Sequence, residues 1–171
     1  GLPAPPDIDV SSWEFMLVNG DNSIDQYEPA QLAYLNQTAD ETDIQTSYNA
    51  NRCPVDERIA QPLLDMALGC KEAGYPIFLS SGYRSYSDQA ANFIRVCNNN
   101  GVADGKDANG FYITMPAGCS EHQTGICCDI TDHYYEIKNR SIENTATYQY
   151  LLAHCHEYGF ILRFPDGKED I

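Results

Sequence analysis

The chain has 171 residues, of which 43% are hydrophobic, and this size fits one compact domain with little room for a second. Ten Lys and Arg against 25 Asp and Glu give a formal net charge of −15, so the chain lacks the positive surface that nucleic acid binding requires. Its apolar stretches are only a handful of residues long, which excludes a bilayer-spanning helix of roughly 20 residues.

The first part of the chain predicts a linker, a strand and a helix. Residues 1–11 are rich in proline and indicate a linker or a trimmed N-terminus, with one domain expected over 12–171. Residues 12–20 alternate imperfectly and end in a turn signal, which predicts a short strand. From 54 to 73, apolar residues recur at helical spacing. Pro62 removes a backbone donor inside this helix, so we expect a kink there or a later start.

The middle of the chain combines a buried strand with a capped helix. Residues 76–80 form a short apolar run typical of a buried strand. Ser85 can cap the N-terminus of a helix that runs to about residue 98. Residues 98–110 are rich in Asn, Gly and Asp and predict a surface loop, followed by a short extended piece at 111–113.

The last part of the chain predicts two strands and one helix. Apolar runs at 126–131 and 160–164 indicate strands, and the segment 145–158 predicts a helix closed by Gly159. Helices mixed with short strands, without regular βαβ alternation, favour an α+β fold over a doubly wound sheet.

The seven cysteines are too few for a disulfide scaffold, and their number is odd. At least one thiol therefore stays free or pairs between chains, and one or two disulfides are expected only if the protein is exported. No pair has the C-x-x-C spacing of a zinc site, so we expect no cysteine ligand. By strand alternation, Cys127 shares a face with Asp129, whereas Cys128 points into packing on the other side.

Two segments carry side chains suited to chemistry. His122 and Asp129 are both good zinc ligands, and the glycine turn between them lets a loop residue and a strand residue converge on one ion. Arg84 stands where a strand turns into a helix, and its guanidinium can bind a carboxylate or a developing oxyanion. Gln89, five residues further on, can line the same cleft. Taken singly, each of these residues also fits an ordinary surface or core role.

Together, four blocks resemble the zinc D-alanyl-D-alanine carboxypeptidases of the vancomycin-resistance type and the related L,D-carboxypeptidases. They follow the family's order across nearly the whole chain, and the Ser-x-His-x6-Asp block is the most specific. The blocks are Ser12-Trp13 with Met16-Leu17-Val18-Asn19, Ser81-Gly82-Tyr83-Arg84-Ser85-Tyr86 with Gln89, Ser120-Glu121-His122-Gln123-Thr124-Gly125 with Asp129-Ile130, and residues 158–171.

The resemblance implies an α+β fold with a small antiparallel sheet, flanking helices and a zinc groove across the sheet. His122 and Asp129 would bind Zn²⁺, Arg84 would act on the substrate carboxylate or the oxyanion, and Ser120, Gln89 and Tyr83 would contact the substrate. The substrates would be peptidoglycan stem peptides that lose a terminal D-alanine. This substrate implies an extracytoplasmic bacterial protein, secreted or associated with the cell envelope.

The chain departs from the family pattern at its end. In the family, the block resembling residues 167–171 continues into a Glu-Pro-Trp-His segment that supplies the general base and the third zinc ligand. This chain stops at Ile171, so we expect the domain at 12–171 to lack that C-terminal segment. We expect the other histidines, at 133, 154 and 156, to be ordinary exposed side chains. Glu121 would point away from the zinc if the segment is extended.

Two alternatives to the carboxypeptidase stay open from the sequence. A catalytically incomplete module could bind peptidoglycan peptides without cleaving them. A dipeptidase or endopeptidase could act on the same substrate class, since relatives include both.

Overall fold

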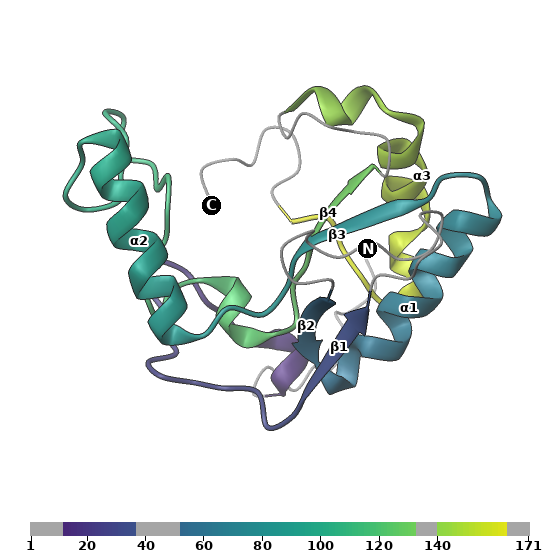
Figure 1. Cartoon of the computed structure of the whole chain (residues 1–171), viewed down its shortest axis with the longest axis horizontal. Helices are drawn as coiled ribbons and strands as arrows, with labels where there is room; N and C mark the ends of the chain where they lie inside the picture. Colours follow the sequence, from purple (N-terminus) through teal and green to yellow (C-terminus); the bar gives the residue numbers. More distant parts are fainter. Residues whose placement is uncertain (1–11, 37–51, 133–139, 164–171) are drawn as a thin grey trace, which may run out of the picture.

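The computed structural model describes residues 12–36, 52–132 and 140–163 and has the expected α+β architecture (Figure 1). In these residues, three α-helices accompany two small antiparallel sheets, which confirms the fold class. The helices are α1 (Glu57–Glu72), α2 (Tyr86–Asn100) and α3 (Ala146–His154). None of the described helices is both long enough and apolar enough to cross a membrane.

Two strand pairs form the sheets. β1 (Leu32–Asn36) pairs with β2 (Arg52–Asp56), and β3 (Ile77–Ser81) pairs with β4 (Asp129–Asp132). The register of the second pair shifts between Leu79 and Ser81, so that Ser81 faces Asp129. Such irregularities redirect side chains where a strand ends. The turn that follows β3 therefore lies beside the first residue of β4.

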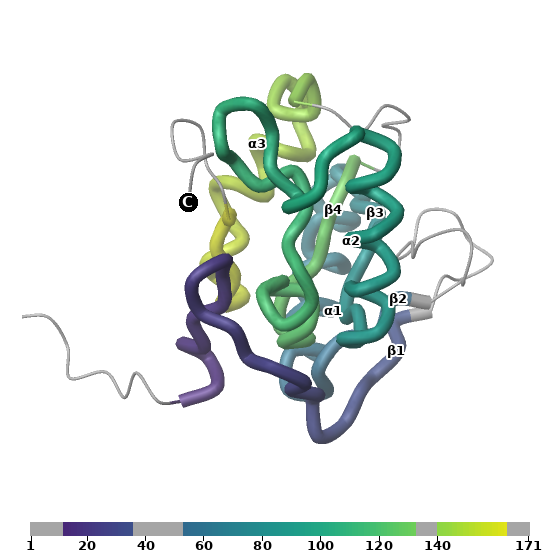
Figure 2. Tube along the Cα trace, turned by 90° about the vertical axis from the view of Figure 1, so that its left-hand side faces the viewer, coloured from purple at the N-terminus to yellow at the C-terminus, as the bar shows by residue number. Residues whose placement is uncertain are grey.

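The core lies between α1 and the strands. Apolar residues of α1 recur on one face and pack against side chains of β2 and β3. α1 and α3 lie together on one side of the β3–β4 pair, and α2 stands apart on the other side (Figures 1 and 2). The buried cluster consists of Cys53, Val55, Ile59, Leu63, Met66, Ala67, Cys70, Ile77 and Leu79.

Strand β2 ends at Asp56, and helix α1 begins at the next residue. Asp56 caps the helix by accepting a hydrogen bond from the backbone N–H of Arg58 at 2.9 Å. The helix therefore begins at Glu57, three residues later than predicted, and Pro62 still lies inside it. Residues 52–56, partly assigned to the helix from the pattern, instead pair with β1.

Capping residues also define where other elements begin and end. Ser85 accepts from the backbone N–H of Asp88 at the start of α2. Thr145 does the same for Tyr148 at the start of α3, which continues as the 3₁₀ helix η4 (Cys155–Tyr158). Gly159 ends that segment with a left-handed φ of 84°, as predicted.

Three sequence predictions of strands need correction. Residues 12–20 form no strand, because η1 (Trp13–Phe15) is a 3₁₀ turn. The Asn19 side chain accepts from the backbone N–H groups of Asp21 and Asn22 and closes a tight turn. β4 starts at Asp129 rather than at 126. Residues 160–163 have no strand partner among the described residues, and the rest of the predicted 160–164 strand lies outside them.

Two further outcomes concern the loops. The predicted extended piece at 111–113 is limited to one bridge between Lys106 and Tyr112. β1 was missed because its sequence, Leu-Ala-Tyr-Leu-Asn, carries only a weak alternation.

Candidate metal and peptide site

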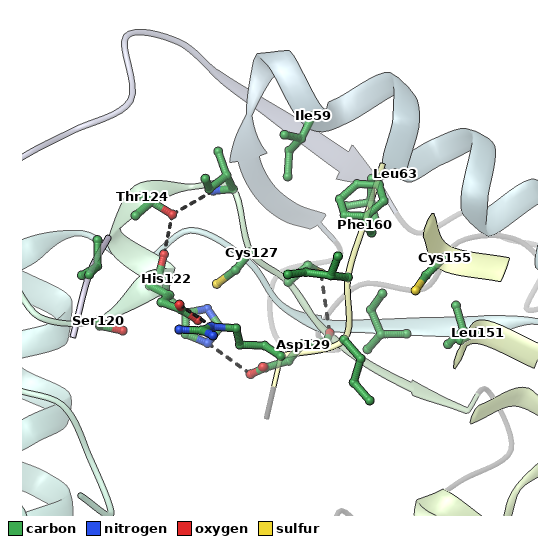
Figure 3. Close-up of a pocket in the computed structure, with 18 of the residues that line it drawn as sticks. Ile59, Leu63, Ser120, His122, Thr124, Cys127, Asp129, Leu151, Cys155 and Phe160 are labelled. Carbon is green, nitrogen blue, oxygen red and sulfur yellow. Dashed lines mark hydrogen bonds and ion pairs between the residues drawn. The ribbon is translucent and has the colours of Figure 1, made fainter. Parts of the chain in front are cut away.

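His122 and Asp129 come together as the sequence predicts. His122 lies in the 3₁₀ helix η2 (Glu121–Thr124), and Asp129 is the first residue of β4. The Nε2 atom of His122 lies 3.4 Å from Oδ2 of Asp129, and the two side chains face each other in Figure 3. Gly125 makes this approach possible, because its left-handed φ of 75° ends η2 and turns the chain toward β4.

The turn after β3 fixes the orientation of His122. The Nδ1 atom of His122 lies 2.7 Å from the carbonyl oxygen of Gly82, to which it donates when it carries the proton. The backbone N–H of Arg84 donates to the carbonyl oxygen of His122 at 3.0 Å. A hydrogen bond from Nδ1 to a carbonyl leaves Nε2 available and is the usual support of a metal-binding histidine.

The donor set fits a tetrahedral zinc ion. Ligand atoms about 2.0–2.1 Å from zinc at tetrahedral angles lie roughly 3.4 Å apart. The His122–Asp129 separation has that value. Within the described ranges, no group of three His, Cys, Asp or Glu residues is arranged to hold a metal. His122 and Asp129 thus offer two ligands, and the described part of the chain does not supply a third.

The electrostatics of the site favour a positive charge on His122. Burial lowers the His122 pKa, but hydrogen bonds to Asp129 and Cys127 and their negative charges outweigh burial and raise the pKa to about 10. The same negative groups would stabilise either a proton or a metal cation at Nε2 of His122.

The two neighbouring cysteines face opposite ways, as alternation predicts. The Cys127 sulfur lies on the side of His122 (Figure 3) and interacts with the imidazole. Cys128 packs against the core cluster, with its sulfur 3.9 Å from that of Cys53.

A cavity of about 1100 Å³ opens beside His122 and Asp129 among the described residues. Ser120 belongs to its wall and is only 5% exposed. The rest of the wall is largely apolar and comes from η1 and the residues that follow it, from α1, from the segment 119–131 and from residues between 140 and 163. Its apolar members include Trp13, Ile59, Leu63, Leu151 and Phe160. A cavity of this size and character suits a peptide with a few charged groups.

Arg84, Gln89 and Tyr83 lie next to this site but do not line the cavity described above. Gln89 is 1% exposed, and its Oε1 accepts from Nη1 of Arg84 at 2.7 Å. The Gln89 side-chain NH₂ donates to the carbonyl oxygen of Met115. Burial raises the pKa of the half-buried Tyr83, and the charges of Glu28 and Asp88 raise it further. The structure thus places Gln89 behind Arg84, where it fixes the guanidinium.

The sequence reasoning missed the role of Gln123. This side chain is fully buried, and its Oε1 accepts from the backbone N–H of Gly118 at 2.9 Å. Its NH₂ group donates to the carbonyl oxygens of Asp25 and Tyr27. Gln123 therefore fastens η2 to the chain segment before β1. A polar residue beside His122 was visible in the motif, but only the fold shows its partners.

Glu121 is engaged elsewhere. The segment is a 3₁₀ helix rather than extended, and Glu121 accepts from Nε of Arg163 at 2.7 Å. The Nδ1 atom of His154 lies 2.9 Å from Oε1 of Glu157. Its ring lies 4.3 Å from that of Tyr150, centroid to centroid. His133 lies outside the described residues.

Comparisons with known proteins cover most of the chain, including the segment that holds this site. The family model described as "VanY: D-alanyl-D-alanine carboxypeptidase" matches residues 52–171. The Bacillus subtilis protein YodJ is 33% identical over 148 residues, which cover 85% of this chain and 50% of YodJ. The solved LdcB LD-carboxypeptidase superposes with a TM-score of 0.74 at 28% identity, covering 92% of this chain and 70% of that one.

A vancomycin-resistance D,D-pentapeptidase VanY, solved in complex with Zn(II), shares the fold with a TM-score of 0.63 at 23% identity. That match covers 94% of this chain and 82% of the other. The chain spans between a third and about half of the length of the curated relatives that it matches.

Proposed function

This chain belongs to the VanY family of D-alanyl-D-alanine carboxypeptidases, and we propose that it is a zinc-dependent enzyme that removes the terminal D-alanine from peptidoglycan stem peptides. The observation that carries the proposal is the His122–Asp129 pair, whose 3.4 Å separation fits two ligands of one zinc ion. The anchoring of Nδ1 by Gly82 adds the support that such a ligand needs.

His122 and Asp129 would hold the metal, and Gly82 would keep the Nε2 lone pair of His122 directed toward it. A zinc ion bound there supplies Lewis acidity and lowers the pKa of a bound water. Arg84 would bind the terminal carboxylate or the developing oxyanion, because a guanidinium forms strong, directed hydrogen bonds to both.

The remaining side chains would orient the substrate. Ser120 lies at the cavity wall, where its hydroxyl can hydrogen-bond to the peptide. Burial raises the pKa of Tyr83 above its already high ordinary value, so its hydroxyl can donate a hydrogen bond. Gln89 would act through Arg84 rather than touch the peptide. The general base and the third ligand are assigned to no described residue.

The test is the release of D-alanine from a muropeptide that ends in D-alanyl-D-alanine, measured on the full-length natural protein. We expect release that stops with a chelator and returns with zinc. His122→Ala should lose both zinc and activity. His156→Ala is the matched control, because His156 is exposed and outside the cavity wall. Full zinc content in His122→Ala would exclude the assigned ligand.

Three substrates separate the related activities. A pentapeptide ending in D-alanyl-D-alanine reports D,D-cleavage, and a tetrapeptide ending in one D-alanine reports L,D-cleavage. The pentapeptide with an amidated C-terminus reports the need for a terminal carboxylate at Arg84. Binding without cleavage of any of the three would instead support a peptide-binding module.

We also propose that the protein acts outside the cytoplasm, since stem peptides of the mature wall are found there. Fractionation of the native bacterium, with detection of the protein in the envelope or medium, tests this placement.

A further inference from the structure

Two cysteines far apart in the sequence meet behind the candidate metal site. Cys53 lies in β2, and Cys128 directly precedes β4. Their sulfurs are 3.9 Å apart although 75 positions separate them in the chain. Cys53 is 2% exposed, and both side chains belong to or pack against the core. We propose that Cys53 and Cys128 form an intramolecular disulfide in the mature protein.

The neighbouring thiol does not compete for this pairing. Successive residues of an extended segment point to opposite faces. Cys127 lies toward His122 (Figure 3), whereas the Cys128 sulfur lies 3.9 Å from that of Cys53. The sulfurs of Cys53 and Cys128 need to approach by roughly 2 Å to reach the bond length of about 2.05 Å. Rotation of the two side chains supplies movement of this size without a change of fold.

The bond forms by exchange with an external disulfide, either glutathione disulfide or an oxidised dithiol protein. The thiolate of one cysteine attacks the external disulfide, forms a mixed disulfide and releases one external thiol. The second thiolate then attacks the mixed disulfide, forms the Cys53–Cys128 bond and releases the other external thiol. Two protons and two electrons leave the protein pair, and the external disulfide is reduced. Since Cys53 is buried, this exchange precedes the final closure of the core.

The bond would join two segments that hold the candidate site in place. Cys128 is adjacent to Asp129, and the residue after Cys53, Pro54, accepts from the backbone N–H of Tyr83 beside Gly82. The cross-link therefore ties the segment that carries Asp129 to the strand that also holds the Gly82 turn. It closes a loop of about 75 residues, and such closure raises the melting temperature of a chain of this size by roughly 10 °C.

Peptide mapping detects the Cys53–Cys128 bond directly and does not depend on enzymatic activity. Absence of the bond can therefore be distinguished from failure of the proposed function. The full-length protein is unfolded in denaturant, refolded with reduced and oxidised glutathione, quenched with acid, alkylated in denaturant and digested with trypsin. We expect peptide 53–58 to be linked to peptide 107–138, with the loss of two hydrogen atoms. The second peptide also contains Cys119 and Cys127. Alkylated peptide 53–58 under oxidising conditions would overturn the proposal.

Variants identify the partner. Cys119→Ser and Cys127→Ser combined leave Cys128 as the single cysteine of peptide 107–138, and the link to 53–58 should persist. Cys128→Ser should leave Cys53 alkylated. A link lost in the double variant would assign the bond to another thiol. Reduction should lower the melting temperature of the double variant by roughly 10 °C, as in the wild type, and an unchanged value would refute the proposed stabilisation.

Discussion

Gln89 offers the sharpest test of how Arg84 is held. We consider Gln89→Met, a replacement of similar volume that removes both polar ends of the side chain. The variant loses the hydrogen bond from Arg84 at 2.7 Å and the one to the carbonyl of Met115. Because Gln89 is 1% exposed, water cannot easily replace it at the Met115 carbonyl.

The expected loss of stability follows from these two bonds. A buried acceptor left without its donor costs about 1–3 kcal/mol, and a hydrogen bond to a charged group contributes about 1.5–3 kcal/mol. Arg84 is half-buried, so water can replace part of the hydrogen bond that its guanidinium loses. We therefore expect a total loss of about 2–3 kcal/mol in the free energy of unfolding. Urea denaturation measures this loss. Gln61→Met is the matched control, because Gln61 is an exposed glutamine of α1 whose partner is Asp65.

The kinetic effect should pass through Arg84. Loss of one orienting hydrogen bond frees the guanidinium, and we expect KM for the pentapeptide to rise about tenfold, which corresponds to about 1.4 kcal/mol. In the Arg84→Met background, Gln89→Met should have no further effect on kcat/KM. Additive effects of the two replacements would refute the positioning role, and so would a wild-type KM in Gln89→Met.

The remaining predictions concern the frame of the site. Asp56 accepts from Arg58, which lowers its pKa, so the stabilisation is present above the ordinary pKa of 3.8 and lost as pH falls through the lower value. Asp56→Asn should cost about 1–3 kcal/mol at pH 7, and acid titration of urea stability should show the difference from wild type vanishing when Asp56 is protonated. Gly82→Ala should destabilise by about 1–3 kcal/mol and weaken zinc binding measured by calorimetry, because its Cβ would collide with the backbone carbonyl oxygen of Pro54. Glu121→Gln should cost less than about 1 kcal/mol in urea, since its pair with Arg163 is partly exposed.

The sequence predicted local features well. The capping residue Ser85 predicted the start of α2, since a serine hydroxyl can accept from the same backbone amide in any fold. The apolar spacing of residues 59–70 likewise predicted the buried face of α1. These signals act within a few residues, so no tertiary information is needed to recognise them.

The pairing of strands was harder to predict. β1 carries little alternation and forms because β2 pairs with it, and the predicted strand at 12–20 has no partner strand among the described residues. The Asn19 side chain closes a turn there instead. Strand formation depends on a partner elsewhere in the chain, and a single sequence does not name that partner.

At the site, the motif indicated which residue types matter but not how they are supported. His122 and Asp129 were expected from their spacing and from the family resemblance, and the structure brings them together. Gln89 was expected to contact substrate, and its burial behind Arg84 became visible only in the fold. The acceptor for His122 is a glycine carbonyl, which has no side chain to signal its role.

This backbone contact links the two halves of the candidate site. The Gly82 carbonyl accepts from the ring of His122, forty positions further along the chain, and the Arg84 amide donates to the carbonyl of the same residue. The backbone of Arg84, whose guanidinium would bind a carboxylate, is therefore held at a fixed place relative to His122, which would bind the metal. In an exopeptidase, the distance between the terminal carboxylate and the scissile bond is fixed by the substrate, so the protein needs a matching fixed distance between its two binding groups. These two hydrogen bonds to the backbone meet this need better than contacts between long side chains. The backbone they hold is already ordered, so it loses little conformational entropy when substrate binds.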